Sequence, residues 1–189
     1  GAFIRIREPI PNRKVLFDIG VAGPLAGFAM MLPVMCYGAI TAESLPSVDA
    51  GVQAGEPLLL SWFLTTLAPT PAEGHSYYLT GPVMAAWVGC LATAMNLFPV
   101  GQLDGGHICH AISARAHRAA SLLSLVAFVG LGLLAFPGWL VFATMILMFG
   151  RHHPPVLDEA SPLGRARVVV AIISLVVLAL CFIPVPFTP

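Results

Sequence analysis

The sequence predicts an all-α fold, a polytopic transmembrane helical bundle with short re-entrant or interfacial elements. Hydrophobic residues make up 58% of the chain and charged residues only 10%, with a mean hydropathy of +0.88, whereas a soluble domain carries about 25% charged residues. In lipid the backbone must satisfy its own hydrogen bonds, and the alternation of short strands typical of a barrel is lacking, so helices are predicted. Four neutral stretches approach or exceed the roughly 20 residues that a spanning helix needs: residues 19–40, 74–103, 119–150 and 168–189.

The third neutral stretch contains a helix breaker near its middle. The Phe-Pro-Gly sequence at residues 136–138 is predicted to divide it into a short helical hairpin of residues 119–135 and 139–149. One long tilted helix is the alternative, because the second arm is short for a full crossing. The apolar segment Leu58–Leu67 is too short to span and is predicted to be re-entrant or interfacial. Residues 168–183 are predicted to form the final span.

The distribution of charge predicts the orientation of the chain. Nine basic and nine acidic residues balance, which argues against a nucleic-acid partner. Residues 41–57 carry acidic but no basic side chains, so the positive-inside rule places residues 41–78 outside. The N-terminus, residues 104–118 and residues 151–167 are predicted to be cytoplasmic because they hold the basic residues: Arg5, Arg7, Arg13, Lys14, Arg115, Arg118, Arg151, Arg165 and Arg167.

The cysteines and the first residues suggest neither a disulfide framework nor an intact start. The first seven residues alternate apolar with basic and are predicted to be a strand or hairpin that continues from earlier sequence. Because position 1 is Gly rather than Met, the chain is expected to be a fragment. Four cysteines lie far apart in the sequence and are predicted to be plain apolar side chains: Cys36, Cys90, Cys109 and Cys181.

The segment Asn-Leu-Phe-Pro-Val-Gly-Gln-Leu-Asp-Gly-Gly-His at residues 96–107 ends the second neutral stretch with one carboxylate. An Asp at the bilayer centre costs about 2.5–3.5 kcal/mol, so Asp104 is predicted to pair with a cation or a metal ion. Pro99 and Gly101 interrupt the helix, and irregular backbone at membrane depth must be shielded by protein or line a wet cavity. These features predict a buried polar site. The alternative is that Asp104 only caps the following helix, entered through two glycines.

At this point the sequence resembles a known family. The pattern Asn-x-x-Pro-x-x-x-Leu-Asp-Gly-Gly at residues 96–106 resembles the second signature of the site-2 protease family of intramembrane zinc metalloproteases, and residues 16–27 resemble the segment between its two metal motifs. The resemblance covers about residues 1–113, and the loop at 150–155 is similar to one bacterial and plastid-type branch.

The resemblance implies two parts in the chain. Residues 1–118 are the C-terminal part of the intramembrane metalloprotease core, and residues 119–189 add a transmembrane hairpin and a final span. The core contains spans at about 19–40 and 79–99 and the Asp motif at 96–107.

In this family a helix with the motif His-Glu-x-x-His supplies two zinc ligands and the general base, and the resemblance implies that Asp104 is the third ligand. Three protein ligands leave the fourth zinc position open for water, whose pKa falls towards ~7. No His-Glu-x-x-His exists in these 189 residues, so that motif is expected upstream of residue 1. The fragment alone is expected to be inactive and to bind no stoichiometric zinc. Asn96 is implied to contact the substrate or the oxyanion, and its alternative is a polar cap for carbonyls freed by Pro99.

Other polar and small residues receive structural interpretations. Spacings of three and six residues from Asp104 converge poorly on one metal ion, so His107 is predicted to support the site or the helix start rather than bind metal, and His110 is not predicted to complete a three-ligand set. Three glycines are predicted to let the absent catalytic helix approach closely: Gly20, Gly23 and Gly27. The other histidines are predicted to be interfacial: His75, His117, His152 and His153.

The resemblance implies an intramembrane zinc endopeptidase that uses Zn²⁺ and cleaves transmembrane segments of membrane-anchored proteins, in contact with the lipid bilayer. The expected location is a bacterial inner membrane, with the active site towards the cytoplasm. One alternative is a catalytically inactive, protease-like protein that binds membrane segments. Another is a small transporter that uses Asp104 as a proton- or cation-linked carboxylate.

Overall fold

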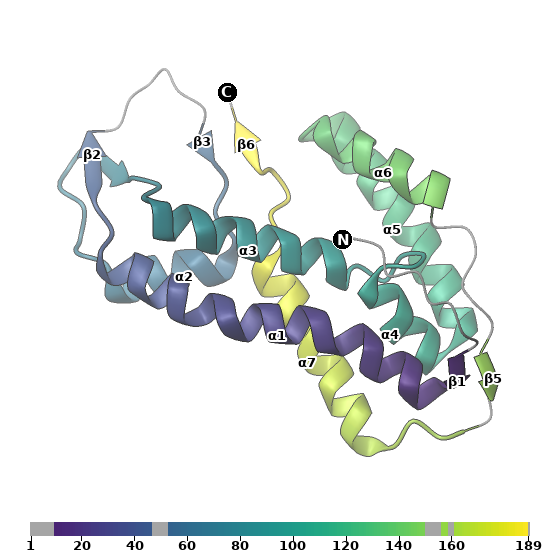
Figure 1. Ribbon diagram of the computed structural model, residues 1–189. Helices are drawn as coiled ribbons and strands as arrows, with labels where there is room; N and C mark the ends of the chain where they lie inside the picture. Colours follow the sequence, from purple (N-terminus) through teal and green to yellow (C-terminus); the bar gives the residue numbers. More distant parts are fainter. Residues whose placement is uncertain (1–9, 47–52, 150–155, 159–160, 189) are drawn as a thin grey trace.

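The computed structural model describes residues 10–46, 53–149, 156–158 and 161–188. Within these ranges the chain is mainly helical, with seven helices and three small two-stranded sheets (Figure 1). Two helices are long and apolar enough to cross a membrane, α1 (Arg13–Ile40) and α5 (Ala114–Leu134). The mainly helical fold is therefore confirmed, whereas the polytopic arrangement stays a prediction.

Helix α1 is the central helix, because most of the other helices pack against it. The Asn12 side chain accepts hydrogen bonds from the backbone N–H groups of Lys14 and Val15, both at 3.0 Å, and so caps the helix start. The helix continues through Pro24 and Pro33 for 28 residues. It includes the predicted span at 19–40 but begins six residues earlier, because the Asn12 cap lies before the charged residues that precede the neutral stretch.

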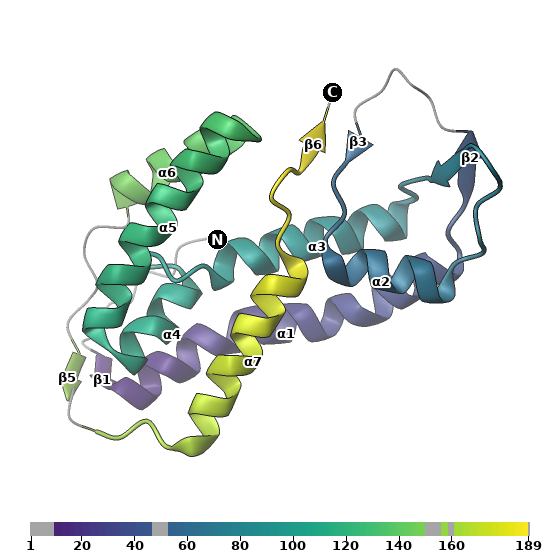
Figure 2. The same ribbon diagram turned by 180° about the vertical axis from the view of Figure 1, so that it is seen from behind.

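Four further helices pack on α1: α2 (Leu58–Leu67), α3 (Gly81–Leu97), α4 (Asp104–Ile112) and α7 (Arg165–Cys181). Figure 2 shows α7 lying across α1 and α3. Gly38 lets the start of α3 approach closely, since a Cβ there would lie 3.1 Å from the backbone of Pro82. The short helix α2 buries Leu59, Leu60 and Leu64 against protein, whereas Leu58 and Trp62 on its other side are exposed.

The four cysteines are free thiols, but two of them are neighbours. Cys90 of α3 and Cys181 of α7 are fully buried, and their thiols are neighbours. Both side chains are buried among apolar residues, as predicted for plain apolar side chains. The packing of α3 on α7 brings together residues that are far apart in the sequence.

Helix α6 (Gly138–Phe149) folds back along α5 (Figure 1). Helix α5 ends at Leu134, and the chain reverses at Pro137. Phe128 of α5 packs against Phe142 of α6, with ring centroids 4.8 Å apart. The predicted hairpin is therefore confirmed, and the alternative of one long helix is wrong.

Short strands join the ends of helices, so the description as all-α needs correction. Each pair joins segments far apart in the sequence, which hydropathy cannot reveal. Two tryptophans hold neighbouring loops, since Trp87 donates to the Gly55 carbonyl at 2.6 Å and Trp139 to the Pro184 carbonyl at 2.7 Å. The pairs are β1 (Ile10–Asn12) with β5 (Val156–Asp158), parallel, and two antiparallel pairs, β2 (Ser44–Pro46) with β4 (His75–Tyr77) and β3 (Gln53–Ala54) with β6 (Phe187–Thr188). The strand or hairpin predicted at residues 1–7 lies outside the described residues.

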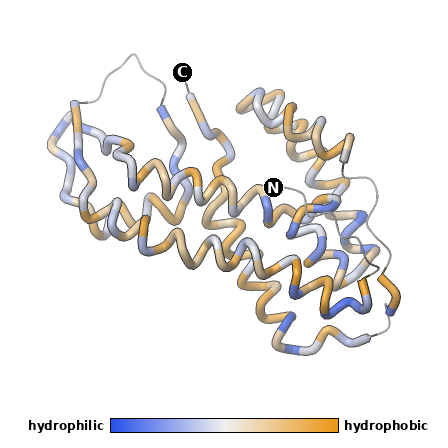
Figure 3. Tube along the Cα trace, viewed as in Figure 1, coloured by the Kyte–Doolittle hydropathy of each residue, from blue (hydrophilic) through white to orange (hydrophobic). Residues whose placement is uncertain are grey.

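Hydrophilic residues gather at two ends of the molecule, near the starts of α1 and α7 and near β2 and β3, with apolar helices between them (Figure 3). The neutral stretches of the sequence predict this distribution. Which end faces the cytoplasm stays a prediction.

Candidate metal centre around Asp104

The candidate centre begins with a tight turn between α3 and α4 (Asp104–Ile112). Helix α3 ends at Leu97, and the Leu103 N–H bonds the Val100 carbonyl at 3.1 Å. Gly101 has φ of 53°, in the left-handed region that glycine adopts without steric penalty. The turn therefore connects the end of α3 to Asp104, where α4 begins.

The two glycines after Asp104 have a steric role. A Cβ on Gly106 would lie 2.7 Å from the Val100 carbonyl oxygen, and a Cβ on Gly105 would overlap the Leu97 carbonyl. Only residues without side chains let the first turn of α4 rest on this backbone. The Asp-Gly-Gly pattern thus fixes where the carboxylate emerges.

Asp104 is the first residue of α4, whereas Leu103 occupies the N-cap position and no side chain caps the helix. The interpretation of Asp104 as a capping residue is therefore wrong. A carboxylate in the first turn still interacts favourably with the helix dipole.

Asp104 faces α1 at two glycines. A Cβ on Gly20 would lie 2.8 Å from the Asp104 carbonyl oxygen and 3.0 Å from the His107 Cβ, and a Cβ on Gly23 would lie 3.7 Å from Asp104 Oδ2. The expectation that these glycines pack against an absent helix is wrong, because they pack against α4 of the same chain. At Gly27 no described atom lies within 4 Å of the position that a Cβ would take, so its packing against an absent helix stays a prediction.

The Asp104 carboxylate is half-buried, and α4 lies outside both candidate spans. Burial raises the pKa of this carboxyl to about 6. Among the described residues the side chain accepts no hydrogen bond and forms no ion pair. A partly desolvated carboxylate in this state favours a cation.

Asn96 lies half-buried in the last turn of α3. Its side chain forms no hydrogen bond within the described part of the chain, so the capping of carbonyls freed by Pro99 is not observed. Contact with a substrate or an oxyanion stays a prediction.

His107 is 4% exposed and lies on the side of α4 that meets Gly20. The described ranges contain no group of three or more His, Cys, Asp or Glu side chains that could hold a metal ion. Within these ranges Asp104 therefore belongs to no set of the three ligands that a catalytic zinc site uses.

His117 is buried within the protein at 7% exposure, and its interfacial level stays a prediction. Its Nε2 lies 3.1 Å from the Gly101 carbonyl oxygen and 3.4 Å from Ser121 Oγ. Ser121 in turn donates to the Pro99 carbonyl at 3.2 Å and accepts from the Gly101 N–H at 3.4 Å. The two side chains fix the turn that leads to Asp104.

The role of His117 and Ser121 was not predicted, although its signal is a His and a Ser four residues apart on one helix face. His75 is half-buried in β4, with Nδ1 3.2 Å from the Glu73 carbonyl oxygen, and its interfacial position stays a prediction. His152 and His153 lie outside the described residues.

These observations define a mainly helical, membrane-type chain that presents one carboxylate where two helices meet, as expected of the site-2 class of proteases. The family described as Peptidase family M50 matches residues 1–137, and the chain belongs to this family of metalloproteases. The resemblance drawn from the Asn96–Gly106 pattern is confirmed.

Several plant proteins are similar to this chain. The probable zinc metalloprotease EGY1, chloroplastic, of Oryza sativa subsp. japonica is 29% identical over 97% of this chain and 33% of its own length. The probable zinc metalloprotease EGY2, chloroplastic, of Arabidopsis thaliana is 30% identical over 99% of this chain and 34% of its own length. The DDT domain-containing protein PTM of Arabidopsis thaliana is 28% identical over 78% of this chain and 9% of its own length.

The chain spans about a third of the length of these metalloprotease relatives. Their names place them in chloroplasts, which does not support the expected bacterial inner membrane. No solved structure matches the chain.

Proposed function

We propose that the protein containing this chain is an intramembrane zinc endopeptidase and that Asp104 is one of its metal ligands. The observation that carries the proposal is the half-buried Asp104 carboxylate, which has no hydrogen-bond or ion-pair partner among the described residues. Membership of family M50 and the relatives named as zinc metalloproteases support the activity.

The residues present can supply one ligand of a zinc site, the Asp104 carboxylate. Carboxylate oxygens bind zinc, and Gly23 leaves the α1 side of Asp104 without a side chain. The remaining ligands are proposed to come from a part of the protein outside these 189 residues, because the chain spans only about a third of its relatives. Zinc, when bound, polarises the scissile carbonyl and lowers the pKa of a bound water. The chain by itself is proposed to be inactive.

Other residues of the chain set the position and orientation of the Asp104 carboxylate. Gly20 and Gly23 set the distance between α1 and α4, while His117 and Ser121 fix the turn that precedes Asp104. Asn96 is proposed to donate its amide N–H to a substrate carbonyl or to the developing oxyanion.

The proposed substrate is the transmembrane segment of a membrane-anchored protein. Such a helix must unwind locally before its backbone reaches the site, because each helical carbonyl is already hydrogen-bonded. The positive-inside rule favours a site near the cytoplasmic face.

The test replaces Asp104 by Asn in the complete protein, which keeps the size of the side chain but removes the anionic ligand. Zinc content and cleavage of a transmembrane substrate are expected to collapse, whereas membrane insertion persists. Asp18→Asn is the matched control, because Asp18 is exposed on α1 and its carboxylate pairs with Arg167. Unchanged zinc content and rate in Asp104→Asn would falsify the ligand assignment.

The alternatives have different outcomes in the same experiment. A protein that only binds membrane segments retains substrate binding and shows no cleavage even without the substitution. A small transporter loses ion-coupled uptake in Asp104→Asn, but family membership favours the enzyme.

A further inference from the structure

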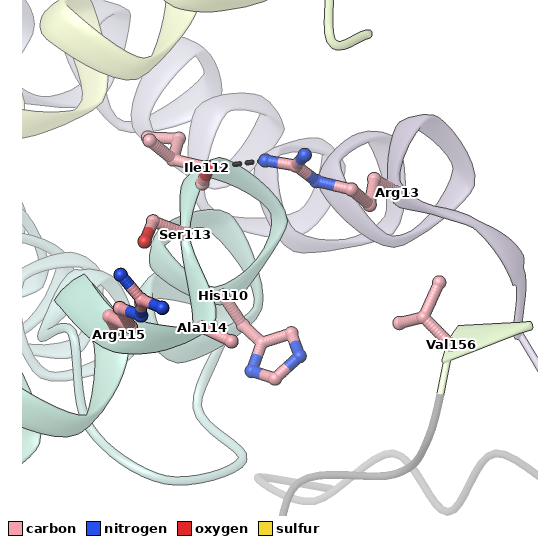
Figure 4. Close-up of a pocket in the computed structure, with 7 residues that line it drawn as sticks. All are labelled: Arg13, His110, Ile112, Ser113, Ala114, Arg115 and Val156. Atoms are coloured by element: carbon pink, nitrogen blue, oxygen red, sulfur yellow. Dashed lines mark hydrogen bonds between the residues drawn. The ribbon is translucent and has the colours of Figure 1, made fainter. Parts of the chain in front are cut away.

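A pocket of about 310 Å³ lies at the C-terminal end of α4, the opposite end from Asp104 (Figure 4). Its polar lining consists of Arg13, His110, Ser113 and Arg115, and Val156 of β5 lies on its other side. The pocket plays no part in the proposed metal centre.

The polar side chains around this pocket include two cations and no anion. Two are arginines, one is a histidine and one is a serine, and no carboxylate is among the lining residues. Arg13 donates from Nε to the Ala111 carbonyl at 2.6 Å and also bonds the Ile112 carbonyl, which holds its guanidinium at the end of α4. Arg115 is exposed and forms no hydrogen bond or ion pair within the described part of the chain.

Two helix N-termini add positive potential at the same place. Arg13 is the first residue of α1, and Ala114 is the first residue of α5. Ser113 caps α5 by accepting from the Ala116 N–H at 3.3 Å. The N–H groups of Ala114 and Arg115 have no partner inside the helix, as in the first turn of any helix, and such groups bind anions.

The pKa of His110 also depends on the positive charges around the pocket. Burial first, and then the nearby His117, His107, Arg13 and Arg118, lower its pKa below the usual value. The imidazole is therefore neutral near pH 7 and contributes one N–H donor. An anion in the pocket would offset the repulsion among the cationic groups.

The pocket also lies at the N-terminal ends of the two apolar helices α1 and α5. The helices α1 and α5 are the two that are long and apolar enough to cross a bilayer, and both begin at this pocket. If they span, their N-terminal ends lie where lipid headgroups lie. Anionic headgroups attract such clusters of basic side chains.

We propose that this pocket binds a phosphate group, supplied either by the headgroup of an anionic phospholipid or by free phosphate. The guanidinium of Arg115 pairs with two phosphate oxygens, the N–H groups at the start of α5 bind a third, and Arg13 adds its charge from α1. This inference does not depend on the proposed protease function, because its residues and its test involve neither Asp104 nor cleavage.

The test measures binding to the complete protein in detergent, with Arg115→Gln as the variant. Arg165→Gln is the matched control, because it removes the same charge from an exposed residue at the start of another helix, α7. The lipid arm counts bound phosphatidylglycerol by native mass spectrometry. The phosphate arm measures the rise in Tm caused by inorganic phosphate against chloride at equal ionic strength.

Binding of phosphatidylglycerol is expected to weaken on the order of tenfold in Arg115→Gln, as for the loss of a charged hydrogen bond, and to change by less than about twofold in Arg165→Gln. Arg115-dependent binding of phosphatidylglycerol alone identifies the lipid headgroup as the source. An Arg115-dependent rise in Tm with inorganic phosphate identifies free phosphate. Equal effects of the two substitutions in both arms, or no binding of either probe, would overturn the proposal.

Discussion

Asp18 of α1 and Arg167 of α7 form a two-pronged ion pair, with Nε to Oδ1 at 2.8 Å and the second nitrogen to Oδ2 at 2.7 Å. The pair joins segments 149 residues apart. It lies two positions before Gly20, where α4 meets α1. One short stretch of α1 therefore fixes both the last helix and the helix that carries Asp104.

Replacing Arg167 by Lys tests the fork geometry of this pair. A lysine keeps the charge but makes one bond in place of two, so the Tm is expected to fall only slightly, because both side chains are partly exposed and solvent screens the pair. Thermal unfolding in detergent measures the change. Arg165→Lys should have no effect, and an equal loss there would show that the ion pair contributes nothing specific.

Adding one methyl group to α1 should have opposite effects at two glycines. Gly20→Ala places a Cβ 2.8 Å from the Asp104 carbonyl oxygen, so α1 and α4 must separate. Overpacking of this kind destabilises by about 1–3 kcal/mol. Gly27→Ala meets no described atom within 4 Å and should stabilise the helix by about 0.5–1 kcal/mol.

Urea or thermal unfolding of both variants checks the sign of each change. In the complete protein, Gly20→Ala is also expected to reduce zinc content, whereas Gly27→Ala retains it. Equal stability of the two variants would contradict the close approach of α1 and α4.

Local features of the sequence predicted the main helices well. The neutral run before Ile40 and the break at Pro137 depend on nearby residues alone, and both appear as predicted in α1 and in the α5–α6 hairpin. The contact between Cys90 and Cys181 and the three strand pairs could not be predicted, because they join segments far apart in the sequence.

The candidate site shows the same division. The position of Asp104 after a helix-breaking turn follows from the motif. The partial burial of its carboxylate agrees with the buried polar site that the sequence predicts. The packing of Gly20 on α4 and the burial of His117 required the fold, since each depends on how two helices cross.

His117 is expected to act on the metal centre only through the turn that it holds. His117→Phe removes the bond to the Gly101 carbonyl, so zinc affinity in the complete protein should fall about 10–100-fold, as for other residues that orient a ligand. Competition with a chelator measures this affinity. His75→Phe is the control and should bind zinc normally, whereas equal affinities in both variants would exclude a positioning role for His117.

The charge distribution predicts that the end of α1 and the start of α7 lie on opposite sides of the membrane. Single cysteines replace Glu43, after α1, and Pro162, before α7, in a variant whose four native cysteines are removed; both positions are exposed. Residues 41–78 lack basic side chains, whereas residues 151–167 contain three, so Glu43→Cys should react with a membrane-impermeant thiol reagent from outside and Pro162→Cys only from the cytoplasmic side.

Intact cells and inverted vesicles give the two directions of labelling, and detergent-solubilised protein shows that each thiol is reactive. Labelling of both positions from one side would refute the orientation, because α1 would then not separate the two loops. Labelling from opposite sides but in the reverse sense would instead move the Asp104 motif and the pocket at Arg115 to the external face. The substrate would then have to be cleaved near its external end, since Arg115 and Asp104 lie on one short helix–turn unit and cannot change sides independently.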